Sequence, residues 1–146
     1  MEIKKVVIDG INIAVIRNDK VLISDVQSAL DTMATVQYEV DAKHIIIHKS
    51  LISEDFFNLK TRLAGDILQK FINYKVKFAI VGDFSMYTSK SLKDFIYECN
   101  KGKDIFYLAT EQQAIEKLST LRGPVRKMRI YNAKPIFLTI PPFLQR

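Results

Sequence analysis

Tryptophan is absent from the sequence, cysteine occurs once, and no proline occurs before residue 124. Because Cys99 has no partner in the chain, an intramolecular disulfide and a cysteine-based zinc site are excluded. The apolar runs, such as Ile45–Ile47 and Phe78–Val81, are far too short to span a bilayer. The first residues also lack the apolar stretch and cleavage site of a secretory signal. We therefore expect a cytoplasmic protein with no membrane partner.

Acidic side chains are missing from the C-terminal stretch. Residues 1–119 hold 16 Lys and Arg against 16 Asp and Glu, whereas the charged side chains of residues 120–146 are all basic. The net charge of +6 therefore belongs to residues 120–146, which also hold all four prolines. A charge-balanced body gives no support for a nucleic-acid surface spread over the fold.

The composition and length favour one folded domain, residues 1–119, followed by a basic, proline-containing tail, residues 120–146. A chain of 146 residues that is 48% apolar can bury a core without disulfides or metals. The domain begins with a predicted antiparallel hairpin, in which the β-branched segments 3–8 and 11–16 flank Asp9 and Gly10. This pair suits a two-residue turn with positive φ at both positions.

Strands and helices are predicted to alternate after the hairpin. Further strands are expected at residues 44–48, 76–81 and 105–109. Helices are expected from Ser24 to Glu39, from Ser53 to about residue 72, from Ser89 to Asn100 and from Thr110 to Ser119. The first and last helices begin with capping-box spacing, Ser24 with Gln27 and Thr110 with Gln113. Gly102 is predicted to end the third helix in a left-handed conformation.

This order predicts an α/β fold. Right-handed crossovers lay the last three strands parallel, while the hairpin supplies antiparallel partners. We therefore expect a mixed sheet of four to five strands, an N-terminal antiparallel hairpin plus parallel β-α units, covered by about four helices.

Polar and aromatic side chains gather where the predicted parallel strands end, which is where open α/β sheets bind ligands. The candidate partner- or ligand-binding residues are Ser50, Ser53, Glu54, Asp55, Asp83, Phe84, Ser85, Tyr87, Thr88, Ser89 and Lys90. Hydroxyls and backbone N–H groups at two helix N-termini can hold an anion or an acidic group of a partner. The alternative is that Ser53 and Ser89 are only helix N-caps. Phe84, Met86 and Tyr87 either pack under their loop or form an exposed binding patch.

Other candidate motifs favour structural roles. Gly82 and Asp83 lack the glycine spacing of a nucleotide-binding loop, which favours a turn that ends the strand. His44 and His48 share a strand face but lie roughly 13 Å apart, too far to share a metal ion. Cys99, at a core-facing helix position, is interpreted as a small apolar residue. The acids Glu54 and Asp55 are favoured by a helix dipole alone. With no catalytic constellation, we predict no enzyme activity, no metal and no cofactor.

Several segments resemble a bacterial domain-of-unknown-function family, number 4180. These are INIAVIR (11–17), VLISDVQSALD (21–31), SEDFF (53–57), LAGDILQKFINY (63–74), IVGDFS (80–85) and SKSLKDF (89–95). The resemblance covers about residues 3–119 and does not extend to the tail. It carries no activity to transfer.

The element order also resembles the STAS domain of anti-sigma-factor antagonists. In that fold a regulatory serine begins the helix after the first crossover strand, and Ser53 is the nearest equivalent here. The resemblance therefore implies possible phosphorylation of Ser53. However, Glu54, Asp55 and Phe56 follow it in place of the usual Asp-Ser-Ser/Thr-Gly turn.

The tail has two interpretations. Its basic part, Arg122 to Lys134, can contact nucleic acid or an acidic partner, and residues 136–140 are predicted to form a strand that adds to a sheet edge in cis or in another subunit. Alternatively, residues 120–146 are a non-native extension produced by read-through or frameshift.

Three functions are expected in order of support. The first is a regulatory, protein-interaction module that binds a protein partner at the strand-end loops, with a homodimer also possible. The second is a sensor of a small anionic ligand or nucleotide at the same strand ends. The third is nucleic-acid contact through the tail.

Overall fold

The computed structural model describes residues 1–120 and 128–132, which form an α/β fold around a six-stranded mixed sheet with the strand order β5-β4-β3-β2-β1-β6. The strands are β1 (Glu2–Ile8), β2 (Ile11–Arg17), β3 (His44–His48), β4 (Lys77–Val81), β5 (Ile105–Leu108) and β6 (Met128–Asn132). The helices are α1 (Val26–Val40), α2 (Leu63–Asn73), α3 (Lys90–Lys101) and α4 (Glu111–Thr120).

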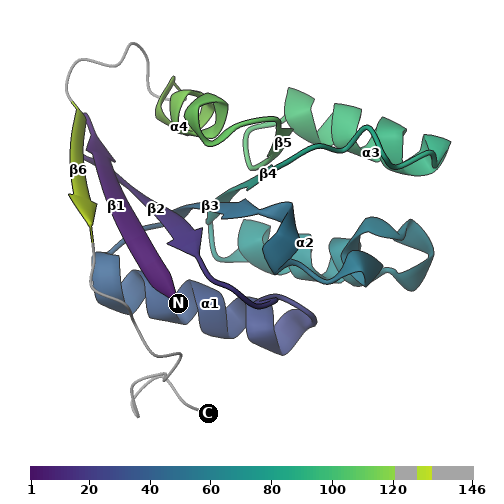
Figure 1. Ribbon diagram of the computed structural model, residues 1–146, viewed down its shortest axis with the longest axis horizontal. Helices are drawn as coiled ribbons and strands as arrows, with labels where there is room; N and C mark the ends of the chain where they lie inside the picture. The colour runs from purple at the N-terminus through teal and green to yellow at the C-terminus, as the bar shows by residue number, and fades with distance from the viewer. Residues whose placement is uncertain (121–127, 133–146) are drawn as a thin grey trace.

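Strands β2 to β5 are parallel, whereas β1 runs antiparallel to both of its neighbours, β2 and β6. The three crossovers from β2 to β5 all step in the same direction along the sheet. Because such crossovers are right-handed, α1, α2 and α3 must lie on the same face. The fourth helix, α4, covers the opposite face, as Figure 1 shows for α4 against α1 and α2.

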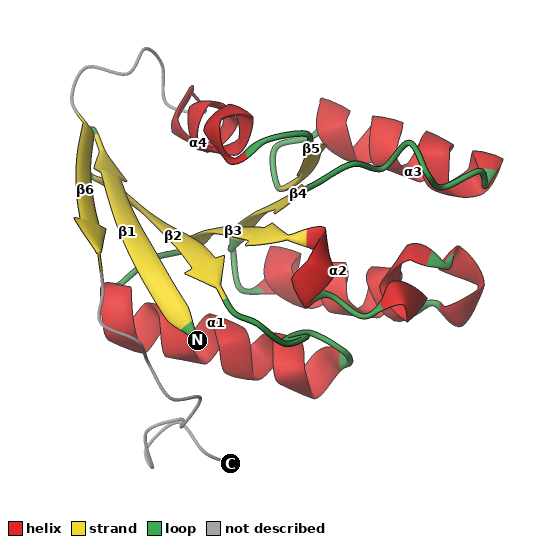
Figure 2. Ribbon diagram, in the orientation of Figure 1, coloured by secondary structure: helices red, strands yellow, loops and turns green. Residues whose placement is uncertain are grey.

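The start of α4 is held to the hairpin by ion pairs. Glu111 Oε2 lies 2.7 Å from Lys4 Nζ on β1, and its Oε1 lies 2.7 Å from Arg17 Nη2 on β2. Partial burial disfavours the Glu111 carboxylate, but the two cations more than offset this effect and lower its pKa. This contact fixes α4 across the sheet face that the other helices leave open (Figure 2).

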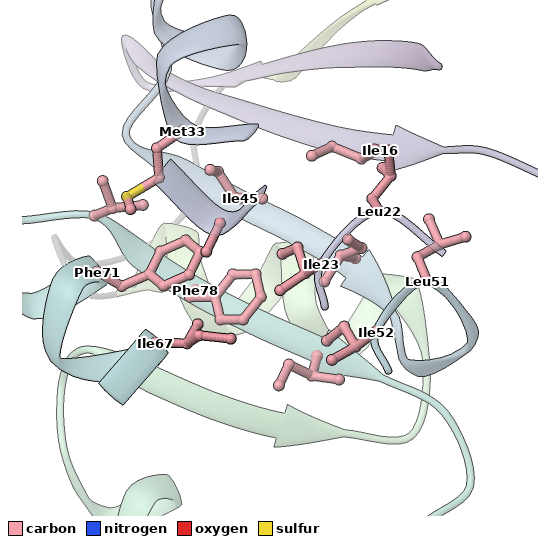
Figure 3. Close-up of a cluster of buried hydrophobic side chains, with 14 of the residues drawn as sticks. Ile16, Leu22, Ile23, Met33, Ile45, Leu51, Ile52, Ile67, Phe71 and Phe78 are labelled. Atoms are coloured by element: carbon pink, nitrogen blue, oxygen red, sulfur yellow. The ribbon is translucent and has the colours of Figure 1, made fainter. Parts of the chain in front are cut away.

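The core has two parts, one on each sheet face. The larger lies between the sheet and helices α1, α2 and α3, and the smaller lies under α4. In the larger part, Phe71 of α2 stacks on Phe78 of β4 with ring centroids 4.1 Å apart. Figure 3 shows this pair beside Ile45 and Ile67. All four side chains are buried, so this packing joins α2 to the two central strands.

The hairpin turn is confirmed. Asp9 has φ 49° and Gly10 has φ 81°, the pair of positive angles that a type I′ turn requires. Ile8 and Ile11 face each other across this turn.

The start of α1 differs from the prediction by one residue. Asp25, not Ser24, is the N-cap, and its carboxylate accepts from Ser28 N at 2.7 Å. Ser28 Oγ in turn accepts from Asp25 N, so the capping box is Asp25 with Ser28. The predicted partner Gln27 instead donates to Asp31 Oδ1 along the helix.

The long helix predicted from Ser53 is wrong over its first half. Residues 49–61 form three 3₁₀ turns, η1 (Lys49–Leu51), η2 (Glu54–Phe57) and η3 (Leu59–Thr61), and α2 begins only at Leu63. Thr61 Oγ1 donates to Asp55 O at 2.7 Å and accepts from Leu63 N, while Asn58 Oδ1 accepts from Lys60 N. These side chains replace helical bonds with local ones. Arg62 then reverses the chain with a left-handed φ of 64°.

Two further expectations are corrected. Gly102 follows α3 with φ −84°, so it ends the helix in an extended conformation, not a left-handed one. The sheet also has six strands where four to five were expected, because residues 128–132, within the predicted tail, form β6 beside β1. The strand predicted at residues 136–140 lies outside the described residues.

Replacing Phe71 by Ala is expected to lower the free energy of unfolding by about 3–5 kcal/mol, because it removes a fully buried ring from the stacked pair. The neighbouring Ile72→Ala is the matched control, since Ile72 is exposed and should cost less than about 1 kcal/mol. Urea unfolding of both variants measures the difference. Equal losses would contradict the assignment of Phe71 to the core.

Candidate functional site

The loops that follow β2, β3 and β4 lie side by side at the carboxyl ends of the parallel strands. Backbone N–H groups of Leu22 and Ile23 donate to Leu51 O at 2.8 and 3.0 Å, and Ser53 N donates to Ile23 O. Ile23 and Ile52 also form a parallel bridge, and Figure 3 shows these residues packed together. The predicted Ser50–Asp55 and Phe84–Lys90 segments both follow strands that end on this side of the sheet.

Three aromatic rings join the β3 and β4 loops. Phe57 of η2 stacks on Tyr87 with centroids 5.2 Å apart and lies 6.1 Å from Phe84. Phe84 in turn meets the buried Tyr107 of β5 edge to face at 5.4 Å. The loop was predicted either to pack its apolar side chains beneath it or to expose them, and it does some of each. Phe84 and Tyr87 are half-buried, whereas Met86 is 63% exposed.

Lys49 is a residue at this site that sequence reasoning missed, as it missed Phe57. Its Nζ lies 5.1 Å from the Tyr87 ring centroid, 6.0 Å from that of Phe84 and 2.9 Å from Met86 Sδ. Its aliphatic stem passes over Gly82, where an added Cβ would lie 2.8 Å from Lys49 Cγ. Gly82 also has φ 149°, so both the backbone and the close approach require glycine. The sequence held one signal for this contact: Lys49 directly follows β3, and Gly82 directly follows the neighbouring strand β4.

Tyr87 and Glu54 form a hydrogen bond across the two loops. The Tyr87 hydroxyl donates to Glu54 Oε2 at 3.0 Å. Partial burial, followed by the hydrogen bond and the negative charge of Glu54, raises the pKa of Tyr87 to about 12. The phenol therefore stays protonated as a donor at neutral pH.

Most of the predicted hydroxyls bond to their own loops. Ser89 Oγ accepts from Leu92 N at the start of α3, and Ser53 Oγ accepts from Asp55 N at 3.4 Å. Ser53 is therefore the cap of a 3₁₀ turn, not of the long helix that was expected. Asp83 Oδ1 accepts from both Ser85 N and Ser85 Oγ, and these bonds lower the Asp83 pKa. The remaining candidates Asp55, Thr88 and Lys90 are exposed at the rim.

A serine–histidine pair also lies at the site. Ser50 Oγ and His48 Nδ1 are 2.9 Å apart, and the same nitrogen accepts from Ser50 N at 3.1 Å. The second bond makes His48 the cap of η1. Within residues 1–120 no carboxylate is bonded to the other ring nitrogen, so the third member of a catalytic triad has no counterpart among them.

Other titratable groups lie away from these loops. Cys99 on α3 is half-buried, and burial followed by the charge of Glu98 raises its pKa to about 11. Within the described ranges, His, Cys, Asp and Glu side chains form no group that can hold a metal ion. In the same ranges, no helix has the length and apolar character needed to cross a membrane.

A family model described as Domain of unknown function (DUF4180) matches residues 8–118, well over half of the chain, and the chain belongs to this family. No curated protein and no solved structure matches it. The likeness to STAS domains therefore stays a prediction.

Replacing Glu54 by Gln is expected to lower the pKa of Tyr87 below about 12, because the negative charge that opposes the phenolate is lost. The pKa should stay above 10, since burial is the larger cause and remains. Ultraviolet titration at alkaline pH measures this change, and Tyr87→Phe identifies the signal.

The same shift predicts the pH dependence of stability. A phenol whose pKa is raised from 10 to about 12 stabilises the fold fully below pH 10, and this contribution is lost as the pH rises to about 12. The stability difference between the native chain and Tyr87→Phe should therefore shrink over that interval. A difference that stays constant over this pH range would contradict the raised pKa of Tyr87.

Proposed function

We propose that this member of the DUF4180 family is a non-enzymatic regulatory module that binds a protein partner at residues 49–57 and 82–90, which we call the strand-end surface. One observation carries the proposal. Met86 is 63% exposed on a loop whose neighbouring rings, Phe84 and Tyr87, are held in place by Phe57, Lys49 and Glu54. An apolar, adaptable side chain on a rigid aromatic base is typical of the central part of a protein interface.

A second exposed apolar residue supports a surface rather than a single point. Val21 is 53% exposed and precedes Leu22, whose backbone bonds to Leu51 beside Lys49. Val21 and Met86 therefore belong to loops that flank the same central β3 loop. The hydroxyls and carboxylates around them supply a polar rim.

The charge of the strand-end surface argues against the alternative of an anionic ligand or nucleotide. Glu54, Asp55 and Asp83 are all exposed there and outnumber the exposed Lys90, while Lys49 is directed over the aromatic rings. The serines that begin η2 and α3 already accept from the backbone N–H groups that an anion would need. Negative side chains and occupied donors both favour a partner that brings apolar and basic groups.

The sheet topology and the composition support the regulatory and cytoplasmic parts of the proposal. The hairpin followed by parallel strands with helices between them is consistent with a STAS-like arrangement. The balanced charge and single cysteine of residues 1–119 favour a reducing compartment. The third expected function was nucleic-acid contact through the tail. The described part of the tail, strand β6, gives no observation that favours it.

Site-specific photo-crosslinking tests the strand-end surface. A benzophenone amino acid in place of Met86 should yield a discrete adduct in cells that produce the protein, because a bound partner would cover this position. The same amino acid in place of Tyr97 is the matched control, since Tyr97 is 62% exposed but lies on α3 outside the surface. Val21→Asp should suppress the Met86 adduct several-fold without changing the unfolding midpoint.

Two results would contradict the proposal. One is the same adduct pattern from positions 86 and 97, which indicates random collision. The other is a strong thermal shift with phosphate or nucleotides, since a ligand at 100 times its Kd adds about 2.7 kcal/mol. That second result would support the small-ligand sensor instead.

A further inference from the structure

The two edges of the sheet are unlike, and the difference does not involve the strand-end surface. At the β5 edge, the side-chain amide of Asn100 bonds to the backbone of Tyr107 in both directions. Asn100 Nδ2 donates to Tyr107 O at 3.0 Å, and Asn100 Oδ1 accepts from Tyr107 N at 2.8 Å. These are the outward backbone groups at the centre of a four-residue strand, so an added strand cannot pair there without displacing Asn100.

At the β6 edge, the hairpin geometry determines which backbone groups point outward. A two-residue turn makes Ile8 and Ile11 a hydrogen-bonded pair, so the even-numbered residues of β1 bond to β2 and the odd-numbered ones to β6. Lys5 and Val7 are paired with Tyr131 and Arg129. The backbone groups of Tyr131 and Arg129 are therefore used within the sheet.

The N–H and C=O groups of Ile130 point the other way, to the outer side of β6. Those of Met128 and Asn132, two residues away on each side, point outward with them. In the part of the chain that the structure describes, no strand pairs with this side. Ile130 is also 53% exposed and Tyr131 48% exposed.

We propose that β6 pairs antiparallel with β6 of a second copy of this chain, about a twofold axis at Ile130. Ile130 then faces the partner's Ile130 in a hydrogen-bonded pair. Arg129 faces the partner's Tyr131, and Met128 faces the partner's Asn132. The two sheets become one continuous sheet across the axis.

Charge and side-chain pairing select this register. Arg129 opposite an aromatic ring gives a cation–π pair on one face of the sheet, and two isoleucines meet on the other face. An axis at Arg129 would place two arginines directly opposite each other, and an axis at Tyr131 would pair only three residues of each strand. The register at Ile130 uses all five residues and opposes no like charges.

The blocked β5 edge limits the assembly to two copies. Growth beyond a dimer needs a second open edge, and Asn100 closes that edge at its centre. The arrangement is therefore a closed pair and not a fibre.

Replacing Ile130 by Pro tests the pairing in the full-length chain. The lost N–H points outward and donates nothing to β1, so β6 should stay in its own sheet. Light scattering during size-exclusion chromatography should give twice 16.8 kDa for the native chain and 16.8 kDa for Ile130→Pro, with unchanged circular dichroism. Ile130→Val is the matched control and should remain a dimer, because it keeps the N–H and a β-branched side chain.

Cysteine pairs test the register independently of folding defects. In a Cys99→Ala background, a mixture of Arg129→Cys and Tyr131→Cys proteins should form a disulfide-linked dimer, since these positions face each other at a non-hydrogen-bonded pair. Either protein by itself should link at least ten-fold less.

A native chain that is monomeric by light scattering would overturn the proposal. This outcome is also the one expected if another segment of the same chain covers β6. A dimer that survives Ile130→Pro would overturn it as well. Efficient linking of Arg129→Cys by itself would overturn the register.

Discussion

The central strands β3 and β4 are buried on both faces, and the architecture follows from the need to cover both. Ile45 and Ile47 point to the face of α1 and α2, while Ile46 between them points to the face of α4. Right-handed crossovers that step in one direction can cover only one face of a sheet. The chain must therefore return over the other face, and α4 does so with Glu111 held by Lys4 and Arg17.

That return also explains why the sheet has a sixth strand. After β5 the sheet could grow only outward beyond the Asn100 contact or on the far side of the hairpin. The start of α4 lies beside the hairpin, where Glu111 pairs with Lys4 and Arg17, and β6 pairs with β1 on the outer side of the hairpin. Among the described residues, β6 thus both completes the sheet and forms its outermost strand on that side. The two edges are distinguished by one side-chain amide, that of Asn100.

The strand-end surface depends on the same parallel arrangement. The carboxyl ends of parallel strands lie on the same side of the sheet. The loops after β2, β3 and β4 therefore meet, although up to about sixty residues separate them in the sequence. Once together, Lys49, Glu54 and Phe57 from one loop hold Phe84 and Tyr87 of the next. Met86, between these two rings in the sequence, stays 63% exposed.

Local sequence patterns determined the features that depend on neighbours in the chain. The Asp9-Gly10 turn, the apolar strands and the caps at Ser89 and Thr110 were predictable because each depends on backbone conformation or hydrogen bonds within a few residues. The loops that meet at the strand ends followed from the strand order alone. The tertiary structure decided the rest.

Residues 53–62 have a helical apolar pattern, yet Phe56 and Phe57 are buried in the larger core and Phe57 stacks on Tyr87. Thr61 holds the 3₁₀ turns. Lys49 over Tyr87, Asn100 on Tyr107 and β6 on β1 are contacts between distant segments, whose energies do not appear in any local window of sequence.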